Sequence, residues 1–509
     1  MISSRDDLNP HQIFFAIRCG KSESISCTYP ESGENLQAPP MIRFVCVWLT
    51  FAGMFGPVQA DSDKRSEAMS FGKGGQKKML YDPRQRPQAV YMDGKVHLVF
   101  NGGGKDGEDP SFRTTPMAST YDPETRSFSK TVTLGKRSKD HHYGPVIWAD
   151  DSGHLHVLSG CHRTPGTHLI SKRPASIGKS LEDWRVGAQI GESISYPAVY
   201  NIEGGKEIIY YRVLGHVGYW TYSVTEDGGE TWRRPEEAVT DMDVAERFEW
   251  SSYQTKLLSQ DGKTLHVAFI VYDDCKFEDP DRAMSDRLYN PRYREKTGQD
   301  WKYNLYYFQI DLASGHVMNF EGETMKTPID VDYADQNCLI WDTEWRGSGV
   351  PPSIVLDEKG DPAFLHVLSG NDSKQEANYF YVFHDGKGWQ KNLITESTHQ
   401  WNSGHLRREE DGTLVAFLVV GDEYLESDGL MDSHGGGRIE EWRSSDQGMT
   451  WQRERDLTPT GSEFSGWRFN NVQPVTKPGG EIVPGMLLFY GWGDPYSPQA
   501  KAFLVDETR

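Results

Sequence analysis

The chain has 509 residues and a formal net charge of −20, from 54 Lys and Arg against 74 Asp and Glu. Hydrophobic residues make up 37% of the chain, which supplies enough apolar surface for a substantial core and excludes a wholly disordered protein. The acidic balance argues against general nucleic-acid binding, because phosphates need a basic surface. No apolar run is long enough to predict a membrane-spanning helix.

The N-terminal region differs in character from the rest of the chain. Residues 1–40 are polar and aperiodic, and we interpret them as a misassigned extension. Residues 41–60 combine a charged start at Arg43, a short apolar stretch and small residues ending at Ala60, which is typical of a signal peptide. A short buried helix is the alternative. We therefore expect residues 61–509 to form a single secreted or periplasmic domain.

Cysteine usage gives little sign of a disulfide framework. Of the six Cys, only Cys161, Cys275 and Cys338 follow the predicted cleavage point. A structural zinc site could be built from Cys275 and Cys338 with Asp273 or Asp274. Their spacing matches no compact zinc motif, and packed thiols are the favoured reading.

One short unit recurs along the chain: an apolar strand, a turn that usually contains Gly, and a second apolar strand. Alternating strands around Asp-Gly or Gly-Gly predict β-hairpins. Seven copies predict an all-β, seven-bladed β-propeller in which each hairpin forms the inner part of a blade. A larger insertion lies at 272–300. The copies are 87–102, 143–160, 196–215, 253–270, 351–370, 405–421 and 472–491.

Two segments share a second pattern. TEDGGETW at 225–232 and SSDQGMTW at 444–451 both fit [ST]-x-D-x-G-x-T-W. They resemble the Asp-box hairpin turns of sialidase-like propellers, in which Asp and Gly shape the turn and Trp packs between strands. The motif indicates the architecture and leaves the chemistry open.

Comparing the copies separates scaffold from candidate site. His97, His156, His266 and His366 occupy equivalent positions in the second strand of their units. A residue that several copies repeat is expected to serve packing, because one active site needs it only once.

Five polar residues, in contrast, occur in single copies. His142 and His162 flank one hairpin, Tyr196 and Arg212 flank the next, and Tyr253 lies in the first strand of the third. In an antiparallel hairpin, the start of one strand lies beside the end of its partner. We therefore expect both histidines at one end of a single blade, and all five side chains on one face of the propeller.

These residues carry a resemblance to a known family. The HHYGP…LSGCH arrangement, the spacing from Tyr196 to Arg212 and the later Tyr253 resemble the propeller ulvan lyases, polysaccharide lyase families 24 and 25, grouped with BNR-type repeat proteins. The specific part of the resemblance covers about residues 140–255. It implies catalytic roles for His142 and Tyr196 and no required cofactor.

The residue types fit β-elimination from a uronate-containing, anionic polysaccharide. Arg212 can grip the carboxylate through two hydrogen bonds and so make the C5 proton more acidic. His142 titrates near neutrality and suits the base that removes this proton. Tyr196 is protonated at rest and suits the acid that protonates the leaving O4. Since glucuronate and iduronate are C5 epimers, Tyr196 is expected to act as base and acid for one of them and His142 as base for the other.

The remaining candidates are assigned to substrate binding. His162 is a further donor, and Tyr253 matches a substrate-contacting tyrosine of family 25. His141 is the alternative to His142 as the match for the first histidine of the family. Trp220, Trp250 and Trp401 could stack on sugar rings, although most propeller tryptophans are core residues.

Three rival functions remain open. A non-catalytic glycan-binding or scaffolding propeller is the strongest rival, because the fold does not fix the function. A sialidase-like hydrolase needs an early Arg-Ile-Pro motif, whereas the only Arg-Ile occurs late, at Arg438-Ile439. A lyase for another uronate polymer would keep the same residues. A polyanionic substrate also requires local positive charge that overrides the acidic protein.

Overall fold

The computed structural model describes residues 68–74, 78–103, 115–138, 140–215, 218–244, 248–273, 301–370, 376–421, 435–493 and 500–508. The chain divides into two units, Met1–Asp63 and Lys64–Arg509. The predicted extension at 1–40 and the predicted signal peptide at 41–60 lie outside the described residues, as does most of the insertion at 272–300.

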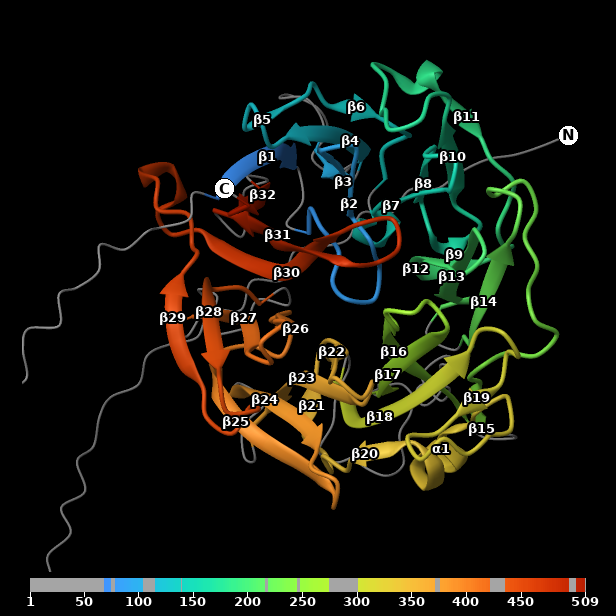
Figure 1. The fold of residues 1–509 in the computed structure, drawn as a ribbon, viewed down its shortest axis with the longest axis vertical. Helices are drawn as coiled ribbons and strands as arrows, with labels where there is room; N and C mark the ends of the chain where they lie inside the picture. Colours follow the sequence, from blue (N-terminus) through green and yellow to red (C-terminus); the bar gives the residue numbers. More distant parts are fainter. Residues whose placement is uncertain are drawn as a thin grey trace, which may run out of the picture. The chain divides into compact units, whose positions relative to one another are not determined.

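Within Lys64–Arg509, the described residues are almost entirely strands. They form six hydrogen-bonded sheets that follow one another in chain order around a centre (Figure 1). The described part contains a single α-helix, α1 (Val331–Asn337), and three short 3-10 turns, η1 (His141–Tyr143), η2 (Leu181–Asp183) and η4 (Ser462–Phe464). No helix among the described residues has the length and apolar character needed to cross a membrane.

The largest sheet contains both ends of the described chain. Its strands are β1 (Met69–Gly74), β32 (Ala500–Asp506), β31 (Ile482–Trp492), β30 (Arg468–Thr476), β2 (Ala89–Met92), β3 (Lys95–Gly102), β4 (Thr115–Asp122) and β5 (Ser127–Phe128), with β6 (Val132–Thr133) paired to β4. The pairings on either side are antiparallel, whereas β30 and β2 meet in one parallel pair, Val90 with Thr476. The sheet therefore consists of two antiparallel sections with a short junction.

The next two sheets have four strands each. The first is β11 (Trp184–Val186), β10 (Thr167–Ser171), β8 (Leu155–Ser159) and β7 (Val146–Ala149). The second is β14 (Trp220–Thr225), β13 (Lys206–Arg212), β12 (Ile194–Ile202) and β9 (His162–Thr164).

The three remaining sheets complete the circuit. A seven-stranded sheet contains β15 (Met242–Val244), β16 (Phe248–Leu258), β17 (Thr264–Asp273), β18 (Trp301–Asp311) and β19 (Val317–Met318), with β20 (Leu339–Trp341) and β21 (Gly347–Ser348) on β18. The next is β22 (Ser353–Leu356), β23 (Pro362–Ser369), β24 (Ala377–His384) and β25 (Trp389–Ser397). The last is β26 (His405–Arg408), β27 (Leu414–Val420), β28 (Arg438–Ser444) and β29 (Gln452–Asp456).

Each of the seven repeats found in the sequence is an antiparallel strand pair. The pairs are β2–β3, β7–β8, β12–β13, β16–β17, β22–β23, β26–β27 and β30–β31. Their second strands are buried almost throughout, because neighbouring sheets pack against both of their faces. His97, His156, His266 and His366 are all buried in these second strands, as expected for packing positions.

The two Asp-containing turns have the same hydrogen bonds. A carboxylate oxygen of Asp227 accepts from the Thr231 amide at 2.9 Å, and Asp446 accepts from the Thr450 amide at 2.9 Å. The glycine that follows each Asp by two positions has a positive φ, which only glycine adopts without strain. The shared sequence pattern thus produces a shared local structure.

Candidate functional site

The polar residues found in single repeats lie in the turn η1 and on two consecutive sheets. His142 is in η1, directly before β7, and Tyr253 is in β16. His162, in β9, pairs with Ser195 of β12, and Ser195 pairs on its other side with Arg212 of β13. His162, Ser195 and Arg212 therefore lie side by side on one sheet, and Tyr253 lies in the middle of β16.

The placement of His162 differs in one respect from the prediction. We expected it at the end of the same blade as His142, but β9 is hydrogen-bonded to the next sheet. The chain leaves β8 at Gly160, whose φ of 77° turns the backbone, and the Gly160 amide donates to the carbonyl of Tyr143. The two imidazoles nonetheless stack, with ring centroids 4.1 Å apart.

A single carboxylate holds both imidazoles. Asp140 is the N-cap of η1 and accepts a hydrogen bond from the His142 backbone amide at 2.9 Å. One of its oxygens also bonds Nδ1 of His142, and the other bonds Nδ1 of His162 at 2.7 Å. Burial alone would raise the pKa of Asp140, but the hydrogen bonds from the two histidines hold this pKa below its usual value.

This carboxylate sets the tautomer of both rings. An ionised carboxylate only accepts hydrogen bonds, so each neutral imidazole carries its proton on Nδ1 and keeps a lone pair on Nε2. Burial lowers the pKa of His142 to about 4, although Asp140 opposes this shift. His142 is therefore neutral at pH 7 and can accept a proton at Nε2. Nε2 of His162 is buried with no partner among the described residues, and it is a donor only when the ring is protonated.

The backbone at Tyr196 is strained. Its φ is +57°, in the left-handed region that disfavours residues with a side chain, and the β12–β13 register shifts between Ser195 and Ala198. Such a conformation costs about 1–3 kcal/mol and is found most often at functional sites. Its consequence here is to direct the Tyr196 ring toward the histidines, with centroids 5.9 Å from His142 and 6.0 Å from His162.

Two arginines lie against the phenol rings. The guanidinium carbons of Arg84 and Arg212 are each 4.7 Å from the centre of the Tyr196 ring. They are 4.1 Å and 5.3 Å from the ring of Tyr253, respectively. Burial raises the pKa of Tyr253, and the two cations oppose this shift.

Arg212 has hydrogen-bonding capacity that the protein does not use. It is fully buried, and its Nη1 donates to Ser251 at 3.2 Å. Its Nε and Nη2 have no partner among the described residues. Adjacent guanidinium donors of this kind can bind both oxygens of a carboxylate. Arg212 can therefore neutralise an acidic group that lies beside Tyr196.

Several site residues were not anticipated from the sequence. Tyr81 and Arg84 precede the first repeat, so comparing repeats could not reveal them. The ring of Tyr81 is 5.8 Å from those of Tyr196 and His142. Arg84 pairs with Asp82 and retains an unpartnered Nη1 among the described residues. A signal for Asp140 was present, because an Asp directly before a short turn is a typical N-cap.

Of the remaining candidates, His141 and Trp401 lie at the site and Trp220 lies in the core. The ring of His141 stacks on that of its neighbour, with centroids 4.0 Å apart. Trp220 is fully buried, and its indole donates to the Ser252 carbonyl, so it is a core residue. Trp401 lies at the site, with the Lys302 ammonium 4.4 Å from its ring. The side chain of Trp250 lies outside the described residues.

Metal-ligating groups occur at one place among the described residues. Asp140, His141 and His142 each offer a ligand atom, all within 4.8 Å of one another. Of the predicted zinc ligands, Asp274, Cys275 and the side chain of Asp273 lie outside the described residues. The thiol of Cys338 is buried, which raises its pKa to about 12, and it contacts the sulfur of Met325 at 3.8 Å.

Comparison with known proteins places this geometry in a family. The model of the BNR repeat-containing family matches residues 113–397. The chain belongs to this family. The match spans the sheets that carry His142, Tyr196 and Tyr253.

The proteins similar to this chain include several ulvan lyases. An ulvan lyase from Nonlabens ulvanivorans is 21% identical over 432 residues, covering 78% of this chain and 82% of that protein. An ulvan lyase from Alteromonas sp. (strain LOR) is 23% identical, covering 67% of this chain and 71% of that protein. A solved ulvan lyase of polysaccharide lyase family 25, bound to GlcA(1-4)Rha3S, has a TM-score of 0.66 at 17% identity, covering 87% of this chain and 96% of that one. The protein thus shares the all-β fold of that lyase.

Proposed function

We propose that this protein is a polysaccharide lyase that cleaves ulvan or a closely similar sulfated, uronate-containing polysaccharide by β-elimination. The observation that carries the proposal is a neutral His142, oriented by Asp140, whose ring lies 5.9 Å from that of Tyr196. On Tyr196 packs Arg212, two of whose donors have no partner among the described residues. The similarity to ulvan lyases, one of them solved with a uronate-rhamnose sulfate unit, supports the same substrate class.

In the proposed reaction, each group has one task. Arg212 binds the uronate carboxylate and stabilises the negative charge that develops when C5 loses its proton. His142 takes this proton at Nε2, the C5–H electron pair forms the C4–C5 double bond, and the C4–O4 bond breaks. Tyr196 gives its proton to O4. The products are a free hydroxyl and an unsaturated uronate, and the balance requires no metal or redox cofactor.

The other site residues are proposed to bind and orient the substrate. His162 and Tyr253 line the reacting centre, and His141 extends it on its exposed side. Arg84 and Lys302 add positive charge beside Trp401 and Tyr253. This local charge offsets the repulsion that a protein of net charge −20 exerts on a polyanion.

We also propose a finer description of the architecture. Counting the nine-stranded sheet as two sections, the strand pairs are those of a seven-bladed propeller, with Asp boxes at 225–232 and 444–451. The signal peptide at 41–60, and hence secretion, remains a proposal that rests on sequence pattern. For Cys275 and Cys338 we favour packed thiols over a structural metal, because their spacing matches no compact zinc motif.

The test is incubation of the protein with ulvan while the ultraviolet absorbance of the unsaturated uronate is followed. We expect a rise for the wild type and a loss of about 10²–10⁴-fold in rate for Tyr196→Phe, because the variant lacks the acid. Tyr200→Phe removes a hydroxyl from the same strand, where it donates to the Lys256 carbonyl, and should retain activity.

The rival functions predict other results. A glycan-binding propeller would bind ulvan with no rise in absorbance, and Tyr196→Phe would leave binding intact. A sialidase-like hydrolase would release sugars with no double bond. A lyase for another uronate polymer would show the rise with that polymer and not with ulvan.

A further inference from the structure

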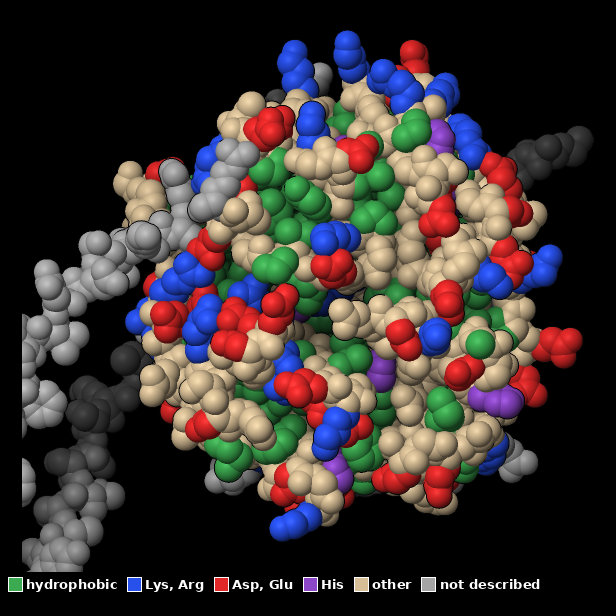
Figure 2. Space-filling view, in the orientation of Figure 1, with side chains coloured by type: hydrophobic (Ala, Val, Ile, Leu, Met, Phe, Trp, Pro, Cys, Tyr) green, Lys and Arg blue, Asp and Glu red, His purple; other side chains and the backbone are tan. Residues whose placement is uncertain are grey.

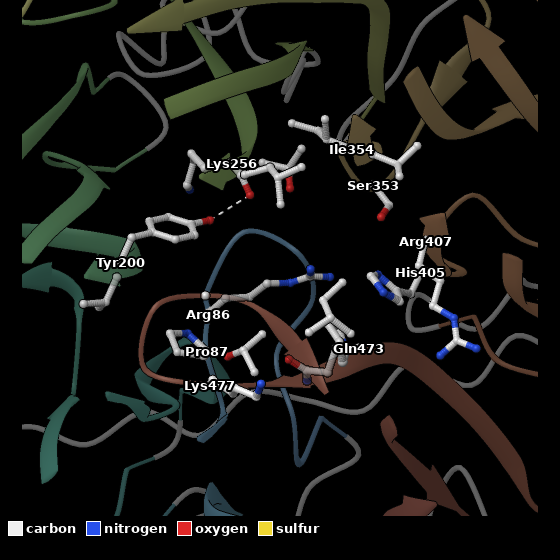
Figure 3. A pocket seen from close by; sticks show the side chains of 18 of the residues that line it. Arg86, Pro87, Tyr200, Lys256, Ser353, Ile354, His405, Arg407, Gln473 and Lys477 are labelled. Atoms are coloured by element: carbon white, nitrogen blue, oxygen red, sulfur yellow. Dashed lines mark hydrogen bonds between the residues drawn. The ribbon is translucent and has the colours of Figure 1, made fainter. Parts of the chain in front are cut away.

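A cavity lies at the centre of the ring of sheets (Figure 3). Its volume is about 230 Å³, and the inner strands of all six sheets contribute to its wall. Tyr196 lies near the start of β12, whereas Tyr200, which lines the cavity, lies near its end. At about 3.3 Å per residue, these positions are roughly 10–13 Å apart along the strand.

The charge of the lining is one-sided. Asp and Glu are absent from the described residues that line the cavity. The basic side chains in the lining are Arg86, Lys256, His405, Arg407, Arg408 and Lys477. Burial and neighbouring cations hold the pKa values of Lys256 and His405 well below their usual values, so the positive charge of the lining comes from the arginines and Lys477. Figure 2 shows acidic and basic side chains intermixed over the surrounding face, as expected for an acidic protein. The cavity therefore departs from the rest of the molecule in its charge.

Carboxylates outside the lining offset only part of this charge. Arg407 forms an ion pair with Glu409 at 3.0 Å, and Lys477 forms one with Glu481 at 2.8 Å. Neither pair neutralises Arg86, at the middle of the cavity; the carboxylate that acts on Arg86 is Asp82, which lies outside the lining and also pairs with Arg84.

Arg86 and His405 form the centre of the cavity. The Arg86 side chain extends across it toward the His405 ring (Figure 3). Nε and Nη2 of Arg86 are buried and have no hydrogen-bond partner among the described residues, and the same is true of both ring nitrogens of His405. Burial and the nearby cations Arg86 and Arg407 hold the pKa of His405 well below its usual value. Buried donors without partners are costly, so a group that satisfies them would stabilise the fold.

We propose that this central cavity is a binding site for a small tetrahedral oxoanion of the sulfate class. Nε and Nη2 form the edge of a guanidinium that can bind two anion oxygens at once. The cavity volume of about 230 Å³ leaves room for a sulfate-sized group and several water molecules. The anion is either free in solution or a sulfate ester on a single sugar.

The anion would also influence the catalytic face. Arg86 lies two residues after Arg84, and its amide donates to the Pro197 carbonyl at 3.1 Å, next to Tyr196. The Lys256 ammonium donates to the Arg84 carbonyl at 3.3 Å. The short segment 84–86 thus places Arg86 in the cavity and Arg84 against Tyr196 at the candidate site.

The test compares thermal unfolding of the full chain in sodium sulfate and in sodium chloride at matched ionic strength. We expect a saturable rise in Tm of about 2–4 °C with sulfate in the wild type, because a ligand that binds only the folded state stabilises it. Sulfate also stabilises proteins non-specifically, without saturation. Arg86→Gln should retain this non-specific part and lose the saturable part.

Two further variants keep the result interpretable. Arg185→Gln also removes one positive charge, from an exposed ion pair with Glu230, and should keep the saturable rise. His405→Gln leaves Arg86 in place and should weaken the sulfate response, which provides a second reading if Arg86→Gln fails to fold. Two results would overturn the proposal. One is an equal saturable rise in Tm for wild type and Arg86→Gln. The other is the absence of a saturable rise in the wild type with both sulfate and rhamnose 3-sulfate.

Calorimetric titration separates the two sources of the anion. Inorganic sulfate that binds wild type but not Arg86→Gln would identify a free ion as the ligand. If rhamnose 3-sulfate, the sulfated sugar of the related complex, binds in this manner and sulfate does not, the ligand is a sugar ester.

Discussion

The carboxylate of Asp140 accepts a hydrogen bond from Nδ1 of His162 at 2.7 Å, although Asp140 caps the turn before β7 and His162 lies in β9, on the next sheet. The second oxygen of the same carboxylate holds His142. One acidic side chain thus fixes the orientation of two imidazoles and leaves Nε2 of each directed away from it. This arrangement prepares a base without placing a positive charge beside Arg212.

The role of Asp140 can be tested by Asp140→Asn. An amide has only one oxygen, so one imidazole loses its acceptor and faces an NH₂ group instead. We expect kcat to fall by roughly 10²–10³-fold with little change in KM, because orientation and tautomer are affected more than binding. Asp150→Asn alters another Asp–His pair, with His156 at 3.2 Å, and should leave kcat unchanged.

The pH profile of kcat/KM gives a separate test of the same contact. Since burial lowers the pKa of His142 to about 4, the wild type should lose activity only as the pH falls toward 4, when the base becomes protonated. Asp140 raises this pKa, so its removal should move the acidic limb to still lower pH. A limb that stays near pH 6.5 in the wild type would contradict the assignment of His142 as base.

The two candidate bases can be separated by substrate epimers. If His142 serves one C5 epimer and Tyr196 the other, His142→Ala should reduce cleavage at one uronate by about 10²-fold or more and spare the other. Product analysis on oligosaccharides containing only glucuronate or only iduronate measures this. His141→Ala is the matched comparison, and a stronger epimer effect in this variant would assign the base to the neighbouring ring.

Arg212→Lys tests the recognition of the carboxylate. Lysine keeps the positive charge but cannot bind two oxygens in a fixed plane, so kcat/KM should fall by about 10²-fold. Arg185→Lys makes the same exchange in an exposed ion pair and should have no effect on activity. Near-normal kcat/KM in Arg212→Lys would show that charge alone is sufficient.

A buried histidine outside the site should make stability depend on pH. Burial lowers the pKa of His366 to about 3, and neither ring nitrogen has a partner among the described residues. Between pH 6.5 and 3 the unfolded chain binds a proton that the folded state does not, so stability falls as the pH falls. This one residue contributes about 2 kcal/mol of destabilisation at pH 5.

His366→Leu should therefore raise Tm, and raise it more at pH 5 than at pH 7.5. Thermal unfolding at the two pH values measures the difference. His316→Leu changes an exposed histidine and should leave the dependence of Tm on pH as in the wild type. An equal gain at both pH values for His366→Leu would show that the effect is one of packing.

The strand pairs, and the proximity of His142, His162 and Tyr196, could be predicted from the sequence, because both depend on local pattern. Alternating apolar residues around a glycine turn determine a hairpin wherever it lies. The attachment of β9 to the following sheet could not be predicted, since it depends on the path of the backbone at Gly160. Arg84 was missed for a related reason: its segment has no repeat partner and reaches Tyr196 only through the closed arrangement of the sheets.

The pairing of β1 with β32, in which Met69 lies opposite Leu504, has a consequence for biosynthesis. β1 is the first and β32 the last of the described strands, so β1 carries an open sheet edge while the chain between them is synthesised. Unpaired edges of this kind promote aggregation. A ribosomal product that stops before Ala500 would keep that edge permanently, and quality-control proteases should remove it in preference to the full-length protein.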